Sequence, residues 1–128
     1  MRLLLDTHAL LWFVEDNTRL SARARRRIEA EQGRVLVSAV SLWEIAIKSS
    51  LGKLTMKVPF DELVTEQLQR NAMEILPIAP PHLTRLHALP FHHHDPFDRM
   101  LAAQALAELM TLVSCDTAFD AYGVTRLW

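Results

Sequence analysis

Four acidic residues have positions in the sequence that could bring their carboxylates together. Asp6 and Asp116 each follow a short apolar run, and Glu44 and Asp98 each fall in the first turn of an expected helix. Clustered carboxylates disfavour one another's ionisation, so such a group calls for a cation. Oxygen ligands suit Mg²⁺ or Mn²⁺, and these ions can bind phosphate oxygens and generate hydroxide from water. The four acids therefore indicate metal-assisted phosphodiester hydrolysis.

Helix capping is the alternative explanation for each acid taken singly. Asp6 can cap the first helix, the segment Ser41–Glu44 fits a capping box, and Asp116 can cap a turn. Asp98 lies in the first turn after Asp95, which we expect to be the N-cap residue. Capping uses one face of a carboxylate and is compatible with a second role. It does not explain why four acids occur where one crevice would form.

Short apolar runs alternate with longer helical patterns along the whole chain. Strands are expected at residues 3–5, 35–37, 74–78, 112–113 and 125–128. Helices are expected at residues 8–14, 21–31, 41–50, 60–72, 81–87 and 96–109. Buried strands separated by helices predict a parallel sheet covered on both faces, so the fold class is α/β, a single-domain α/β/α sandwich over residues 1–128.

The expected sheet suggests where the acids would meet. Parallel sheets bind ligands beyond the carboxyl ends of their strands, at the point where the strand order reverses. If the first and fourth strands are neighbours, Asp6 and Asp116 share that crevice. Glu44 and Asp98 would then reach it from the beginnings of two helices.

Composition narrows the functional class. The length of 128 residues is typical of one domain with one hydrophobic core. The formal net charge of −1 does not by itself indicate a nucleic-acid partner. Residues 1–60 carry 10 Lys/Arg against 6 Asp/Glu, so this half either supplies a phosphate-binding face or forms a solvated basic helix. The three glycines form no phosphate-cradling loop and no dinucleotide fingerprint, which argues against an NTPase or a dehydrogenase.

The single cysteine and the N-terminus suggest the cellular compartment. Cys115 is alone, which excludes an internal disulfide and favours a reducing compartment. It lies in an apolar run and is expected to be a buried, inert thiol. The apolar run at residues 3–5 is too short for a signal peptide or a membrane span, so a cytoplasmic protein is expected.

Several other side chains could take part in chemistry. Three consecutive histidines, residues 92–94, do not converge easily on one ion, so a solvated loop near the site is expected, with one imidazole available to contact RNA. Trp12, Trp43 and Trp128 are expected to be core or dimer contacts. Arg99 has two open roles, pairing with an acid or contacting the scissile phosphate.

Four segments, in order along nearly the whole chain, resemble the motifs of PIN-domain ribonucleases of the VapC toxin type. They are Leu5–His8, Ser38–Glu44, His93–Ala105, and Ser114–Phe119 together with Tyr122–Val124. The resemblance implies strand order 3-2-1-4-5 and endoribonuclease activity with Mg²⁺ or Mn²⁺ on an RNA substrate. It also implies a homodimer, no membrane association, and neutralisation by a small VapB-like antitoxin.

The same resemblance assigns residues to roles. Asp6, Glu44, Asp98 and Asp116 correspond to the acidic, metal-binding and catalytic set. Thr7 and Ser114 correspond to hydroxyls near the metal and its waters, and Arg99 is a supporting residue. Ser114 stands where many relatives have threonine, which keeps the hydroxyl.

Three other functions compete with a toxin nuclease. A signalling receiver domain would need adjacent acids after the first strand and a lysine after the last, but Asp6 is followed by Thr7 and residues 123–128 contain no lysine. A PIN nuclease of RNA processing, outside toxin–antitoxin systems, fits the same motifs. A catalytically inactive PIN-fold binding module is disfavoured by the presence of all four acids.

Overall fold

The computed structural model describes all residues, 1–128, and contains one five-stranded parallel sheet. Its strand order is β3-β2-β1-β4-β5, as the family resemblance implied. The strands are β1 (Leu3–Leu5), β2 (Val35–Ser38), β3 (Glu74–Leu76), β4 (Thr111–Val113) and β5 (Arg126–Leu127). Reversal of the strand order at β1 puts the expected crevice beyond the carboxyl ends of β1 and β4.

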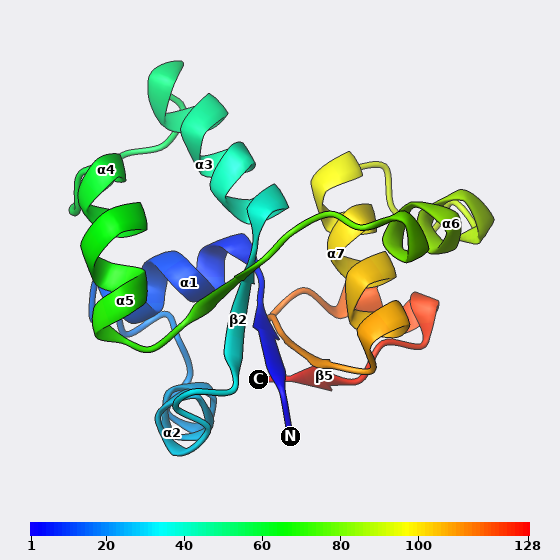
Figure 1. The fold of residues 1–128 in the computed structure, drawn as a ribbon, viewed down its shortest axis with the longest axis horizontal. Coiled ribbons are helices and arrows are strands. Elements are labelled where there is room, and N and C mark those ends of the chain that lie inside the picture. Colours follow the sequence, from blue (N-terminus) through cyan, green and yellow to red (C-terminus); the bar gives the residue numbers. More distant parts are fainter.

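Helices cover both faces of this sheet (Figure 1). They are α1 (Thr7–Val14), α2 (Ala22–Ala30), α3 (Ala39–Ser50), α4 (Phe60–Glu62), α5 (Leu68–Arg70), α6 (Pro80–Ala88) and α7 (Pro96–Glu108). A π-helical turn, η1 (Leu63–Gln67), joins α4 to α5, and a 3₁₀ helix, η2 (Thr117–Tyr122), precedes β5. Helices α1, α3 and α4–α5 lie on one side in Figure 1, and α6 and α7 lie on the other. None of these helices is both long and apolar enough to cross a membrane.

Strand β1 lies at the centre of the core and is buried on both faces. Leu3 and Leu5 belong to one apolar cluster with α1, α2 and α3, and Leu4 belongs to a second cluster with α7. All three leucines are fully buried, because successive side chains of a strand point to opposite faces. A rigid central strand therefore supports Asp6, the residue that follows it.

Most boundaries differ from the sequence prediction by a residue or two, and at β3 and α3 the reasons are local. Strand β3 ends at Leu76 rather than residue 78, since Pro77 has no N–H for the ladder. Helix α3 begins at Ala39, with Ser38 as its N-cap, because the Ser38 Oγ accepts the Val40 N–H at 3.0 Å. The capping box predicted at Ser41–Glu44 is therefore wrong.

Ser41 and Glu44 consequently have other surroundings than predicted. The Ser41 Oγ is the only buried side-chain polar atom without a hydrogen-bond partner. Glu44 lies in the second turn of α3 rather than the first.

The surroundings of Cys115 also correct the prediction, and those of the tryptophans separate core contacts from an exposed side chain. Cys115 is exposed, because Val113 and Ser114 turn inward where β4 ends. Trp12 and Trp128 pack against the core, with ring centroids 5.9 Å apart, as expected. Trp43 is 57% exposed and touches Phe97 edge-on, so it is not a core residue.

Candidate active site

Asp6 is held at the carboxyl end of β1 by its capping contact. Its Oδ1 accepts the Ala9 N–H at 2.8 Å, which makes Asp6 the N-cap of α1. Burial raises the pKa of Asp6, while hydrogen bonds from the Ser114 side chain and the Ala9 backbone oppose that rise. A carboxylate that is costly to ionise in this position favours a nearby cation.

Asp116 reaches the same crevice from β4. Strands β1 and β4 pair in parallel, with Leu5 opposite Val113. Asp116 caps η2 by accepting the Ala118 N–H at 2.9 Å, and its charge contributes to the raised pKa of Asp6. The expected meeting of these two acids at adjacent strand ends is therefore present in the structure.

Asp98 carries the clearest electrostatic signature. It lies in the first turn of α7, after the N-cap Asp95, whose Oδ1 accepts the Phe97 N–H at 2.8 Å. Burial is the main cause that raises the pKa of Asp98 to about 7; the charges of Asp95, Glu44 and Asp6 add to the rise, and His93 opposes it. Asp98 is thus electrostatically coupled to both Asp6 and Glu44.

Glu44 approaches the site from α3 with its charge already partnered. The Thr7 hydroxyl donates to Glu44 Oε1 at 2.6 Å, and Lys48 Nζ lies 2.5 Å from Oε2. The Glu44 carboxylate is buried, with 4% of the residue exposed. Thr7 and Ser114, the two expected hydroxyls, therefore contact Glu44 and Asp6 respectively.

His93 lies within the site; the sequence placed its loop near the site but did not predict its contact with the acids. Its Nε2 lies 3.2 Å from Asp98 Oδ2 and 3.4 Å from Asp116 Oδ2. Ligand atoms of these three residues all lie within 4.8 Å of one another. The expected solvated loop describes the exposed His92 and His94 but is wrong for His93. His93 is the first residue of the third motif, His93–Ala105, and this membership could have indicated a place in the site.

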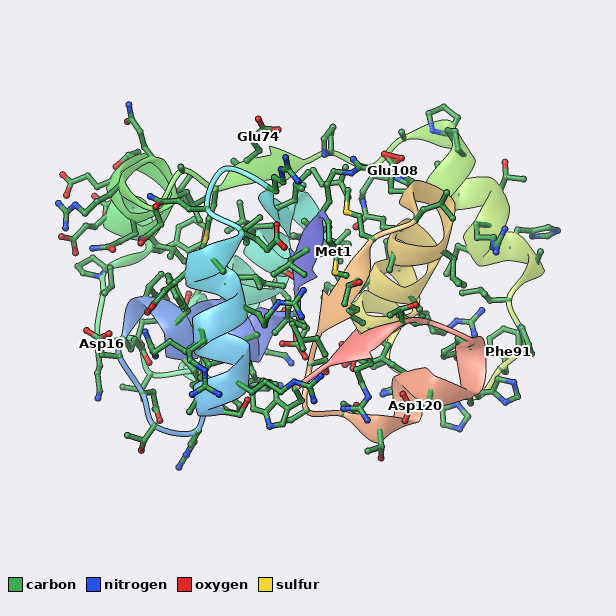
Figure 2. The ribbon with its side chains drawn as sticks, turned by 90° about the horizontal axis from the view of Figure 1, so that it is seen from below. Met1, Asp16, Glu74, Phe91, Glu108 and Asp120 are labelled. Atoms are coloured by element: carbon green, nitrogen blue, oxygen red, sulfur yellow. The ribbon has the colours of Figure 1, made fainter.

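Arg99 does not pair with an acid, which was one of the two roles considered for it. Its guanidinium donates to the Pro90 carbonyl at 2.8 Å and to the Tyr122 hydroxyl at 3.3 Å. It also lies over the Phe91 ring, with 4.1 Å from Cζ to the ring centroid. Phe91 itself is 80% exposed at the outer end of the molecule, away from Asp16 (Figure 2). Arg99 therefore holds the loop before α7 instead of pairing with an acid.

The donor set fits a hard divalent cation. Carboxylates of Asp6, Asp98 and Asp116 meet from the ends of two strands and the beginning of one helix, with Glu44 beside them. Oxygen-rich sets of this kind suit Mg²⁺ or Mn²⁺. The raised pKa of Asp98 has the direction expected of acids assembled without a counter-charge.

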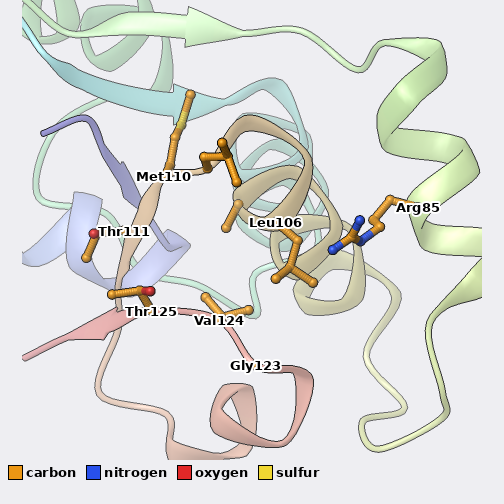
Figure 3. A pocket seen from close by; sticks show the side chains of 9 residues that line it. Arg85, Leu106, Met110, Thr111, Gly123, Val124 and Thr125 are labelled. Carbon is orange, nitrogen blue, oxygen red and sulfur yellow. The ribbon is translucent and has the colours of Figure 1, made fainter.

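One cavity of the molecule lies away from the acids. It has a volume of about 250 Å³ and is lined by Arg85, Leu106, Met110, Val124 and five neighbours at the C-terminal end of α7 (Figure 3). Asp98 is at the opposite end of the same helix. None of the predicted site residues lines this cavity, so the acidic cluster is the better candidate for chemistry.

Solved structures similar to this chain come from bacterial two-protein complexes. The VapBC2 complex of Rickettsia felis bound to a DNA fragment from its promoter contains a chain with TM-score 0.74 and 17% identity, covering 99% of this chain and 98% of that one. DNA-bound VapBC from Salmonella typhimurium gives TM-score 0.75 and 16% identity, covering 99% and 97%. FitAcB from Neisseria gonorrhoeae gives 0.68 and 19%, covering 98% and 96%.

Sequence comparison identifies the family independently of these structures. No curated protein matches the chain significantly in sequence. The PIN domain family, in contrast, matches residues 3–124, nearly the full length. The strand order, the acids at the ends of β1 and β4, and the similar VapBC and FitAB chains agree with that match. The chain belongs to the PIN domain family.

Proposed function

We propose that this chain is a Mg²⁺- or Mn²⁺-dependent endoribonuclease and the toxin of a toxin–antitoxin pair. The observation that carries the nuclease proposal is the close approach of Asp98 and Asp116, electrostatically coupled to Asp6, with the pKa of Asp98 raised to about 7. Acids in this arrangement bind a cation more readily than they tolerate one another. The toxin proposal rests on the family and on similar chains found in VapBC and FitAB complexes.

The acidic residues would divide the work of holding the ion. Asp6, Asp98 and Asp116 would hold it, and Glu44 would orient its water molecules while fixed by Thr7 and Lys48. A bound ion would polarise the phosphate and supply the attacking hydroxide. Capping bonds on Asp6 and Asp116 fix one oxygen of each carboxylate and leave the other for the site. Ser114 strengthens this arrangement by contacting Asp6 and accepting the Asp116 N–H.

The antitoxin would act on the same acids. An arginine is the side chain best suited to enter, since its planar guanidinium binds carboxylates in a bidentate manner. Two exposed apolar side chains, Trp43 on α3 and Leu51 just after its last residue, would supply part of the wider interface. A homodimer is the assembly that we propose for the free protein.

Expression in bacteria tests the two levels of this proposal separately. Wild type expressed alone should slow growth and should cleave RNA in vitro when Mn²⁺ is added. Co-expression of the small gene adjacent to its own should restore growth. Asp6→Asn should be harmless and inactive yet still bind the partner, because asparagine retains the helix cap and the wider interface remains.

The possible outcomes separate nuclease from toxin. RNA cleavage by a wild type that is harmless at a verified high level would leave a PIN nuclease outside toxin–antitoxin systems. Absence of cleavage with either metal would leave a PIN-fold binding module. Full activity in Asp6→Asn would remove Asp6 from the proposed site.

A further inference from the structure

The loop between α6 and α7, residues 89–95, is held from inside the protein. Buried Arg99 donates from its guanidinium to the carbonyls of Pro90 at 2.8 Å and of Leu89 at 3.4 Å. These contacts fix the backbone just before His93. The buried guanidinium is hydrogen-bonded to these loop carbonyls, as buried polar groups generally are, and it holds the loop backbone in one position.

His93 is fixed within that loop by two further bonds. Its backbone N–H donates to the Tyr122 hydroxyl at 2.8 Å. Its ring Nδ1 accepts the Asp95 N–H at 3.1 Å. A nitrogen that accepts a hydrogen bond carries no proton, so the proton of the neutral ring is on Nε2. His93 therefore presents an N–H donor to the site in one tautomer and one orientation.

The direction of this donor distinguishes His93 from a metal ligand. Nε2–H faces the Oδ2 atoms of Asp98 at 3.2 Å and of Asp116 at 3.4 Å. Histidines that bind metals generally donate their other ring N–H to an acceptor, which fixes the metal-binding nitrogen without its proton. Here the other nitrogen accepts from Asp95 instead. The tautomer is thus the opposite of the one that ligation through Nε2 requires.

A donor held at this point has a use in phosphodiester cleavage. A cation bound by Asp98 and Asp116 would take up part of the acceptor capacity of their oxygens, and Nε2–H would remain beside the phosphate that such a cation binds. The ring would stay in place, because the bonds that hold His93 come from the Asp95 backbone N–H and go to the Tyr122 hydroxyl. Neither bond involves the carboxylates of Asp98 or Asp116. Building on the proposed nuclease function, we propose that His93 donates its Nε2–H hydrogen bond to a non-bridging oxygen of the scissile phosphate. A preorganised donor there stabilises the charge that develops in the transition state.

Three substitutions test the donor role in single-turnover RNA cleavage at saturating Mn²⁺. His93→Leu should slow cleavage on the order of 100-fold, the usual loss on removing one donor to a developing oxyanion. His93→Gln retains an N–H donor and should recover most of the rate. His94→Leu is the matched control, since His94 is exposed in the same loop and should cleave as wild type does. Equal rates for His93→Leu and wild type, or equal losses for Leu and Gln, would overturn the donor role.

Two measurements without RNA test the same inference. Long-range ¹H–¹⁵N spectra of the metal-free protein should find the His93 proton on Nε2, with His93→Gln identifying the signal. Electron spin-echo spectra of bound Mn²⁺ should lack a directly coordinated nitrogen. A proton on Nδ1, or a nitrogen signal lost in His93→Gln, would make His93 a ligand and overturn the proposal.

The outcomes also separate this inference from the function on which it rests. A wild type that cleaves no RNA would remove both proposals. An active wild type matched by His93→Leu would remove only the phosphate-donor role.

Discussion

The two halves of the acidic site deal with their negative charge in different ways. On the α3 side, Glu44 has a lysine at 2.5 Å and the Thr7 hydroxyl at 2.6 Å, so the buried carboxylate is fully partnered. On the α7 side, Asp98 faces the His93 ring and other acids, and its pKa rises to about 7. The Glu44 carboxylate has a positively charged partner without a metal, whereas Asp98 lies among other carboxylates.

This difference indicates where a cation acts. A carboxylate with its own lysine gains less from an added ion than one surrounded by acids. We therefore expect Asp98 and Asp116 to dominate metal binding, with Asp6 beside them. Glu44 would contribute mainly by position. Substitutions that add or remove charge in either half should therefore change metal binding and activity to different extents.

Cleavage activity should separate the halves most strongly. Asp98→Asn and Asp116→Asn should each lose activity on the order of a thousandfold, equivalent to about 4 kcal/mol in the barrier. Glu44→Gln should lose less, since its side of the site does not depend on the ion for charge balance. Single-turnover rates at saturating Mn²⁺ measure this, with Asp95→Asn as the control, because asparagine caps α7 as well as aspartate does. A larger loss in Glu44→Gln than in Asp98→Asn would reverse the comparison.

Metal-dependent stability should follow the same division. Mn²⁺ at about 100 times its dissociation constant should stabilise wild type by about 2.7 kcal/mol, because it binds only the folded state. The shift in melting temperature should be much smaller in Asp98→Asn and only partly reduced in Glu44→Gln. Scanning calorimetry with and without EDTA measures these shifts. Equal shifts in all three proteins would point to non-specific ion binding.

The pH dependence of the metal-free protein should depend on Asp98. Its folded-state pKa, about 7, lies above the unfolded value of about 3.9, so protonation favours the folded state. That stability is fully present below the unfolded pKa and is lost as pH rises toward about 7 and beyond.

Urea unfolding in EDTA checks this expectation. Between about pH 5 and about pH 8, wild type should lose about 2 kcal/mol more than Asp98→Asn, allowing for solvent screening of a side chain that is partly exposed. Parallel pH profiles for the two proteins would contradict the raised pKa.

Sequence reasoning located the acids because their positions follow from backbone geometry. Parallel strands end at one edge of a sheet, and the family resemblance made the first and fourth strands neighbours, so Asp6 and Asp116 could be placed together before the fold was known. Glu44 and Lys48 are four residues apart on a helix, a spacing that favours an ion pair, but this pair was not among the predictions.

His93 and Arg99 could not be placed by the same reasoning. Three consecutive histidines have no period, and only one of them is turned inward, by a tyrosine 29 residues away. Arg99 binds loop carbonyls, which have no side-chain signature in the sequence. Tertiary contacts determine both positions. For this reason the His93 Nε2–H donor could be identified only from the three-dimensional structure.

Removing Lys48 offers the subtlest way to make the two halves alike. In Lys48→Met the apolar stem is kept, while the buried Glu44 carboxylate loses its only salt-bridge partner. Because the Lys48 side chain is 40% exposed, the loss of stability in the metal-free protein should be only about 1 kcal/mol. Both halves would then lack a counter-charge, and Mn²⁺ should raise the melting temperature of Lys48→Met more than that of wild type. Lys53→Met, an exposed lysine beyond the end of α3, serves as the control. A smaller Mn²⁺ shift in Lys48→Met would mean that Lys48 organises the metal site rather than substituting for its charge.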